Sequence, residues 1–161
     1  MKIAILADTH IPKRAAKLPA SAWEVIKGAD AIIHAGDVVT QQFLDQLAAI
    51  APLYAVRGNN DDGLSDLPEV LQLELAGVPI AVIHDSGDKK GRAARMRKRF
   101  PAARVVIFGH SHIPLNEDQD GLLLFNPGSP TDRRKQPECT MGILMLGDSR
   151  ISAEIIPLAC R

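Results

Sequence analysis

Short apolar runs of strand length recur along the whole chain, and no other feature of the sequence restricts the possible folds as much. Helix-like stretches separate the early runs, an alternation typical of βαβ units with parallel strands. Later, turns at Ala76–Gly77 and Asp120–Gly121 predict hairpins. We therefore expect a mixed α/β fold with parallel pairing early and antiparallel pairing late. The predicted strands are Ile3–Ala7, Ala31–His34, Leu53–Val56, Val70–Leu75, Val78–Ile83, Arg104–Phe108, Leu122–Phe125, Thr140–Leu146 and Ile151–Pro157, and the predicted helices are Pro19–Lys27, Thr40–Ile50 and Asp88–Phe100.

Size and charge fit a globular protein whose ligands bind at a local site. The chain has 161 residues, 46% hydrophobic and 24% charged, which predicts one domain over residues 1–161. The formal net charge is zero, so no global field recruits nucleic acid or an anionic membrane. We therefore expect no membrane association and no stable nucleic-acid complex, and we leave a homo-oligomer open.

The cysteines and the N-terminal run bear on the compartment. Cys139 and Cys160 lie far apart and form no CxxC or Cys/His pattern, so we expect no disulfide and a reducing environment. The first apolar run ends at Asp8, too soon for a signal peptide or a spanning helix. Both features favour a cytoplasmic protein.

Polar clusters follow the buried runs where parallel strands would end. They are "ADTH" with Asp8 and His10, "HAGD" with His34 and Asp37, "RGNNDD" with Asn59, Asn60, Asp61 and Asp62, "HDS" with His84, and "GHSH" with His110 and His112. Loops at the carboxyl ends of parallel strands gather at one edge, where ligands bind. We therefore expect these side chains to meet in one crevice.

Local spacing supports convergence within each cluster. Residues i and i+2 of an extended chain point to the same side, which brings Asp8 toward His10 and His110 toward His112. A glycine stands immediately before several candidate ligands and allows close backbone approach. These glycines are Gly36, Gly58 and Gly109.

Imidazole and carboxylate groups together form a donor set for Zn, Mn, Fe or Ni. The pool is too large for one tetrahedral zinc site. With one shared carboxylate it suits two ions roughly 3.5–4 Å apart. "GNNDDG" is not a calcium loop, because Gly58 stands where the first aspartate belongs.

The ordered motifs "DTH", "GD", "GN.D", "H" and "GHSH" resemble those of the calcineurin-like metallophosphoesterase superfamily. The short length and the "NPGS" at Asn126–Ser129 resemble its small single-domain phosphodiesterase (YfcE-like) branch, over Lys2 to about Ser129. The resemblance implies a four-layer αββα sandwich with two mixed sheets. It implies one ion on Asp8, His10 and His112, a second on Asn59, His84 and His110, and Asp37 bridging both.

The implied activity is hydrolysis of a phosphate ester by in-line attack of a hydroxide that bridges the ions. We expect Mn, with Ni, Fe, Zn and Mg as alternatives, and a small phosphodiester or nucleotide-like substrate. Asp37, Asn59 and His110 are the expected catalytic residues. The histidine ligands must be neutral, so activity should fall in mild acid.

Two positions depart from the superfamily pattern. Asn60 stands where many members have the histidine of "GNH", which is interpreted as a proton donor, so we expect diesters with good leaving groups. Ser86 stands where relatives often have a histidine, which leaves its role open.

Other polar residues carry no assigned role. His34 fits core packing or a hydrogen bond to a ligand loop, and Asp61 fits either a turn or a similar support. Ser129 or Asn126 could touch substrate or only form a turn. The basic run 89–99 is expected to be a solvated helix face.

Two rival functions were weighed against the phosphoesterase. The first is a non-catalytic or weakly active protein-binding scaffold on the same fold, which we would expect to lose ligands, whereas all seven are present. The second is a nucleotide-binding α/β domain, which requires GxGxxG or GxxxxGK[ST] after a strand. Neither motif occurs in the chain.

Overall fold

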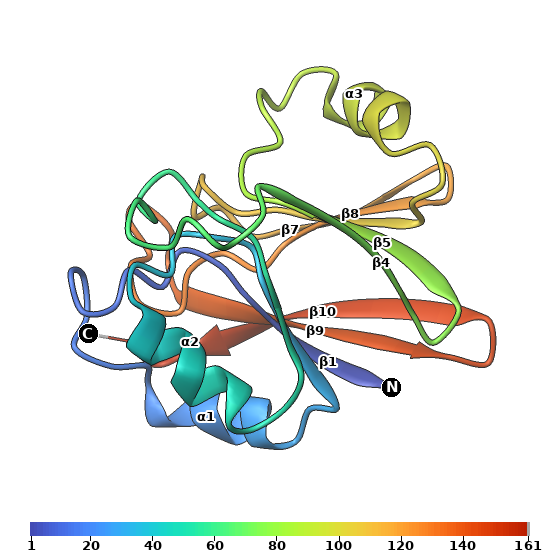
Figure 1. Ribbon diagram of the computed structural model, residues 1–161. Coiled ribbons are helices and arrows are strands. Elements are labelled where there is room, and N and C mark those ends of the chain that lie inside the picture. Colours follow the sequence, from blue (N-terminus) through green and yellow to red (C-terminus); the bar gives the residue numbers. More distant parts are fainter. Residues whose placement is uncertain (161) are drawn as a thin grey trace.

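Two five-stranded sheets form the centre of the protein in the computed structural model, which describes residues 1–160 (Figure 1). The first sheet has the order β10-β9-β1-β2-β3, and the second has the order β4-β5-β6-β8-β7. The strands are β1 (Lys2–Leu6), β2 (Ala31–His34), β3 (Leu53–Ala55), β4 (Val70–Leu75), β5 (Val78–Ile83), β6 (Val105–Ile107), β7 (Leu115–Gln119), β8 (Leu122–Asn126), β9 (Cys139–Gly147) and β10 (Arg150–Leu158), and the helices are α1 (Ala20–Lys27), α2 (Gln41–Ala48) and α3 (Arg92–Arg99).

Alternating side chains along each strand build four layers. In β1, Ile3 and Ile5 point into the core between the sheets, whereas Ala4 and Leu6 face α1 and α2. In the second sheet, one side of β6 joins the central core and Val106 packs on the side that α3 covers. Figure 1 shows α3, the two sheets and the α1/α2 pair stacked in that order. The predicted αββα sandwich is confirmed.

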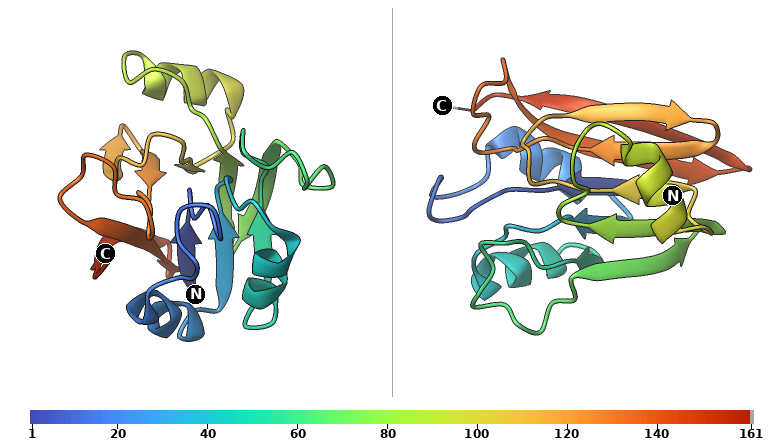
Figure 2. Two further views of the ribbon diagram at one scale, coloured as in Figure 1. Left: turned by 90° about the vertical axis from the view of Figure 1, so that its left-hand side faces the viewer. Right: turned by 90° about the horizontal axis from the view of Figure 1, so that it is seen from above.

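Parallel pairing directs several strand ends to one side of the molecule. Strands β1, β2 and β3 are mutually parallel in the first sheet, and β5, β6 and β8 are parallel in the second. The hairpin partners β4, β7 and β10 run antiparallel to their neighbours. The loops that follow the parallel strands therefore collect at one end, which faces the viewer in the left view of Figure 2.

The predicted hairpin turns have the expected backbone. Ala76 and Gly77 have φ of 49° and 76°, and Asp120 and Gly121 have φ of 52° and 88°. Such consecutive left-handed residues make the tight turn whose twist matches paired strands. Strand β7 was foreseen only as one arm of a hairpin, because its exposed polar residues give no apolar run.

Helix α3 begins at Arg92, four residues after the predicted start at Asp88. Gly87 and Gly91 both have positive φ, which no α-helix accommodates. The spacing of Ala93, Ala94, Met96 and Phe100 predicts the inner face of this helix; Met96 and Phe100 are buried as predicted, but Ala94 is exposed and the prediction is wrong there. Thr40 precedes α2, but its hydroxyl donates to the Ile11 carbonyl at 3.3 Å and makes no cap hydrogen bond.

The expectation that the cysteines stay unpaired is wrong. Cys139 and Cys160 form a disulfide with their Cα atoms 5.8 Å apart, inside the range that this bond requires. The β9–β10 hairpin explains the pairing, because its register sets Cys139 opposite Leu158, two residues before Cys160. The separation of the two cysteines along the sequence does not indicate their distance in space, because the hairpin brings the end of β10 back beside the start of β9.

The helices are too short to cross a bilayer. Within residues 1–160, none combines the length and the apolar character that a membrane span needs.

Candidate metal centre

The structure brings all seven predicted ligand residues together where the two sheets meet. Three loops of the first sheet supply Asp8 and His10 after β1, Asp37 after β2 and Asn59 after β3. Two loops of the second sheet supply His84 after β5, and His110 and His112 after β6. Backbone hydrogen bonds join neighbouring loops of the same sheet, including Asp8 N–H to Gly36 O at 3.0 Å, and the His110 N–H links the two sheets by donating to Asp8 Oδ2 at 2.9 Å.

Convergence arises from left-handed backbone, so the argument from extended chain was wrong. Strands β1 and β6 end before the ligands, and the loops bend sharply. Side chains 8 and 10 do meet, but His110 and His112 reach different parts of the centre. Positive φ outside glycine is uncommon and clusters at functional sites. The ligand residues with φ between 45° and 71° are Asp8, His10, Asp37, His110 and His112.

Asp8, His10 and His112 form a buried group suited to one cation. The Asp8 Oδ1 atom lies 3.9 Å from His10 Nε2 and 3.7 Å from His112 Nε2. These distances are too long for hydrogen bonds, and all three atoms are buried without a hydrogen-bond partner. Buried polar atoms left unpaired are costly, and a shared cation satisfies all three.

A second group lies on the other side of the two aspartates and reaches the surface through Asn59 and His110. Asp8, Asp37 and His84 offer ligand atoms within 4.8 Å of one another. Asn59 Oδ1 lies 2.9 Å from His84 Nε2 and 3.1 Å from His110 Nδ1. Asn59 and His110 are exposed, whereas the first group is buried.

Both aspartates lie between the two groups. Asp37 Oδ2 is 3.4 Å from His10 Nε2 and 3.4 Å from His84 Nε2, and Asp8 belongs to both donor clusters. The carboxylates therefore have the position that a shared ligand requires.

Burial and mutual contacts set the protonation of the metal-free centre. Burial raises the pKa of Asp8 from 3.8 to about 7. Burial also lowers the pKa of His10 and of His112, which keeps their nitrogens free to bind a cation. Although burial disfavours the His84 imidazolium, the carboxylates of Asp37 and Asp8 raise its pKa.

The Asp37 carboxylate stays ionised. Burial alone would raise its pKa, but hydrogen bonds and the positive charge of His84 lower it below the ordinary value, helped by Asn60. The Asn60 backbone N–H donates to Asp37 Oδ1 at 2.9 Å, and its carboxamide donates to Oδ2 at 2.8 Å.

Backbone carbonyls orient two of the imidazoles. His84 Nδ1 donates to Ala35 O at 2.7 Å, and His112 Nδ1 donates to Asp132 O at 2.6 Å. Each bond leaves Nε2 as the nitrogen that faces the aspartates, which is the usual way proteins fix a ligand tautomer. The sequence gives no sign of the contact to Asp132, because it lies 20 residues from His112.

Asp61 supports the Asp37 loop, one of the two roles left open for it. Its buried carboxylate accepts N–H groups from Asp37 at 2.8 Å, Val39 at 2.7 Å and Gly58 at 2.8 Å. The exposed neighbour Asp62 makes no comparable contact among the recorded hydrogen bonds. Asp61 therefore joins the loops after β2 and β3.

The close-approach role predicted for three glycines is confirmed. A Cβ on Gly36 would lie 2.7 Å from His84 Nδ1, and one on Gly109 would lie 2.9 Å from Asp8 Oδ2. A Cβ on Gly58 would clash with the Asp37 carboxylate and backbone nitrogen. A methyl group at any of these positions would displace a candidate ligand.

His34 connects the first two ligand loops and takes no ligand position. It is fully buried, and burial lowers its pKa to about 3. Its Nδ1 accepts the Gly36 N–H at 3.2 Å, so Nε2 carries the proton and lies 3.0 Å from the Thr9 hydroxyl. Thr9 is a support that sequence reasoning missed.

The "NPGS" loop is structural in this state. Ser129 is buried and its hydroxyl donates to Asp8 O at 2.8 Å. Buried Asn126 donates to Gly109 O at 3.1 Å. Both side chains hold ligand loops and are turned away from solvent.

Several arginine side chains of helix α3 make contacts within the protein. Arg95 donates to the carbonyl of buried Ser86 at 2.8 Å, and Arg97 donates to Gln119 O at 2.6 Å. Arg92 lies over the Phe108 ring at 4.8 Å. Most of the basic side chains remain exposed, in line with a solvated face.

Comparison with known proteins agrees with this fold and with a metal-dependent phosphoesterase. Residues 1–149 match the calcineurin-like phosphoesterase superfamily domain, and the chain belongs to this superfamily. A probable metallophosphoesterase of Methanocaldococcus jannaschii is 36% identical over 163 residues, covering 98% of this chain and 82% of that protein. Family and Asp/His clusters together define a metal-dependent phosphoesterase.

Solved structures share the architecture. A structure described as that of a novel archaeal phosphodiesterase superposes with a TM-score of 0.74 at 24% identity, covering 97% of this chain and 100% of that chain. Vps29 of Entamoeba histolytica, solved in complex with zinc, has a TM-score of 0.79 at 19% identity, covering 98% and 99%. At these identities the likeness concerns the fold alone.

Proposed function

We propose that the protein is a phosphodiesterase that uses two divalent cations. The observation that supports this most directly is the pair of donor groups on either side of Asp8 and Asp37. The unpartnered buried atoms of Asp8, His10 and His112 fit one ion. His84, Asn59 and His110, with the aspartates, fit the other.

The chemistry of the donors favours Mn, Fe, Ni or Zn over ions that prefer all-oxygen sites. When bound, two such ions supply hydroxide near neutral pH and offset the negative charge of a phosphate ester. The chain keeps Asp37 ionised through Asn60 and His84, and keeps His10 and His112 neutral through burial.

The substrate enters from the side of the exposed group. A cavity of about 510 Å³ is bordered there by Asn59, His84 and His110. Arg57 and Arg99 also border it, together with the acidic residues Asp62, Glu69 and Asp85, and Arg57 is paired with Glu69 at 2.8 Å. We assign this cavity to the organic group of the ester.

A preference for an acidic leaving group rests on Asn60, and the preference for a diester rests on the likeness to the archaeal phosphodiesterase. The Asn60 carboxamide already donates to Asp37 and has no acidic proton to give a leaving group. An ester whose leaving group departs without protonation is therefore the better substrate. Diesters of acidic alcohols meet this requirement.

The test uses metal-free protein reloaded separately with Mn, Ni, Zn and Mg. Hydrolysis of bis(p-nitrophenyl) phosphate is compared with that of p-nitrophenyl phosphate, and bound metal is counted by elemental analysis. We expect two ions per chain, faster diester turnover, and loss of turnover in both Asp37→Ala and His110→Ala. The exposed variant Asp66→Ala is the matched control and should remain active.

Turnover that survives chelation, or that persists in both variants, would refute the assignment. Two bound ions without turnover of any ester would favour a binding scaffold on this fold.

A further inference from the structure

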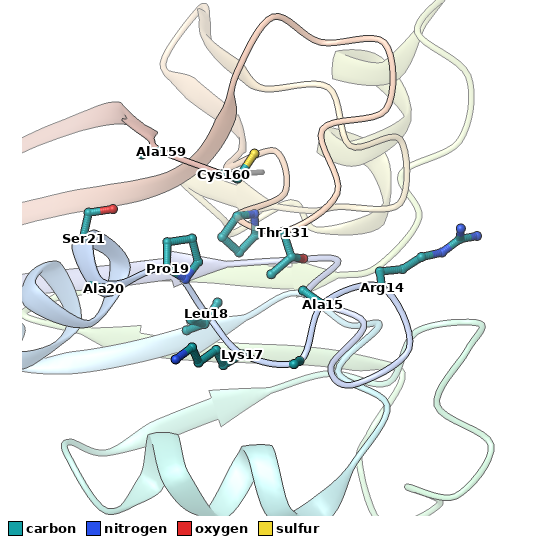
Figure 3. Close-up of a pocket in the computed structure, with 12 residues that line it drawn as sticks. Arg14, Ala15, Lys17, Leu18, Pro19, Ala20, Ser21, Thr131, Ala159 and Cys160 are labelled. Carbon is teal, nitrogen blue, oxygen red and sulfur yellow. The ribbon is translucent and has the colours of Figure 1, made fainter.

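A cavity separate from the candidate metal centre lies next to the loops that carry the buried donor group. It has a volume of about 690 Å³ and is walled by three segments (Figure 3). The first is Arg14–Ser21, which continues from His10. The second is Pro130–Thr131. The third is Ala159 and Cys160, which follow β10.

Two of these walls are bonded directly to the candidate ligand loops. Thr131 Oγ1 donates to Thr9 O at 2.7 Å, and the Arg14 N–H donates to His10 O at 2.8 Å. The residue after Thr131 is Asp132, whose carbonyl orients His112. A movement of either wall would therefore displace the buried donors.

The third wall is held covalently. Cys160 follows the last strand and is bonded to Cys139, the fully buried first residue of β9. Next to Cys139, the Thr140 N–H donates to Ser129 O at 2.9 Å and its hydroxyl donates to Pro127 O at 2.7 Å. The disulfide therefore joins Cys160 to a strand that is hydrogen-bonded to the loop whose Ser129 hydroxyl supports Asp8.

We propose that the Cys139–Cys160 disulfide is a reversible redox latch that sets the metal affinity of the buried donor group. Cys160 is the accessible partner, because it is only partly buried and borders the cavity. A low-molecular-weight thiol, as its thiolate, attacks Cys160 Sγ and breaks the S–S bond. Cys139 leaves with the electron pair and takes a proton from solvent.

A second thiolate then attacks the sulfur of the bound small thiol, and Cys160 leaves with the electron pair and takes a proton. This step releases the oxidised thiol pair and leaves two protein thiols, so two electrons pass from the reductant to the protein. Reduction frees Ala159 and Cys160 and removes one wall of the cavity. The loops carrying His10 and Asp132 then lose support, whereas the loops of Asn59 and His84 do not contact this wall in the hydrogen bonds described.

The metal-affinity part of this proposal rests on the proposed function, and a second measurement does not. Thiols are first counted in denaturant before and after reduction, with none expected before and two after. Hydrogen exchange of the metal-free protein is then compared between the two states. We expect faster exchange at residues 9–18 and 128–132 after reduction, and unchanged exchange at residues 57–62.

Manganese titration calorimetry is performed on the oxidised and reduced forms after the reductant is removed anaerobically. We expect the tighter binding step to weaken about tenfold on reduction, a size typical of lost support to a metal ligand. Cys160→Ser should reproduce the reduced protein whatever the redox conditions. The double variant Cys139→Ser/Cys160→Ser, if folded, should not respond to reductant.

Two free thiols that persist after treatment with oxidant would overturn the proposal. Equal hydrogen exchange and equal manganese affinity in the oxidised and reduced proteins would also overturn it and would leave the disulfide with a purely structural role. A change in exchange without metal binding in either state would refute the proposed function and leave the mechanical link intact.

Discussion

Adding one methyl group at Gly58 tests how the candidate metal centre is supported. In Gly58→Ala the new Cβ would clash with Oδ1 and N of Asp37. Gly58 does not have positive φ, so alanine accepts its backbone and acts through the clash alone. Relief requires the Asp37 loop and the Gly58 loop to separate.

The separation has a calculable cost. Asp61 Oδ2 accepts the N–H groups of both Asp37 and Gly58 at 2.8 Å, so the two loops cannot move apart without losing one bond. Overpacking costs about 1–3 kcal/mol, and a lost hydrogen bond to a charged group costs about 1.5–3 kcal/mol. We expect the free energy of unfolding to fall by about 3 kcal/mol, which lowers Tm by about 6–12 °C at this chain length.

Scanning calorimetry of metal-free protein measures the loss of stability, and manganese titration measures the effect on the ligands. We expect metal affinity to fall by about 10–100-fold, because Asp37 is displaced. Gly63→Ala is the matched control, since a Cβ there meets nothing within 4 Å. If Gly58→Ala and Gly63→Ala have the same Tm and the same affinity, the reasoning is refuted.

Three further predictions concern the supports and the two donor groups. Asp61→Ala leaves three N–H groups without their acceptor and should cost about 3 kcal/mol in urea unfolding, whereas exposed Asp62→Ala should stay within about 0.5 kcal/mol; equal losses would contradict the role of Asp61. Burial lowers the pKa of His34 from 6.5 to about 3, so its neutral form contributes stability above pH 6.5 that is lost as the pH falls toward 3. The stability advantage of wild type over His34→Asn should therefore shrink by up to about 1.4 kcal/mol per pH unit in that window, and parallel profiles would count against it. Metal titration should show a tight and a weak step, with His112→Ala removing the tight step and His110→Ala the weak one; loss of the same step in both variants would disprove the division.

Much of the fold could be predicted because buried strands appear in the sequence as recurring apolar runs. The strands Ala31–His34, Val70–Leu75 and Val78–Ile83 have the predicted ends, since a tight turn or a polar loop begins where each run stops. Strand β7 has no such run, because an exposed edge strand needs no apolar side chains. Sequence patterns therefore indicated the buried strands better than the exposed one.

The candidate ligands could be predicted from their position after buried strands, but their supports could not. Thr131 is hydrogen-bonded to Thr9, more than a hundred positions away, and Asp132 is hydrogen-bonded to His112 on another loop. No local sequence pattern encodes such contacts. The left-handed backbone at Asp8 and His110 was also missed, because loop dihedrals depend on the surrounding packing. The disulfide was missed for a related reason, since its closure follows from strand register.

Because the donors come from two sheets, cations bound at the proposed centre would also have a mechanical role. His84, His110 and His112 belong to one sheet, whereas the aspartates, His10 and Asn59 belong to the other. Cations bound between them would cross-link the two sheets of the sandwich. Loss of those cations would weaken the resistance of one sheet to sliding over the other, and a small shear from elsewhere in the protein would release metal.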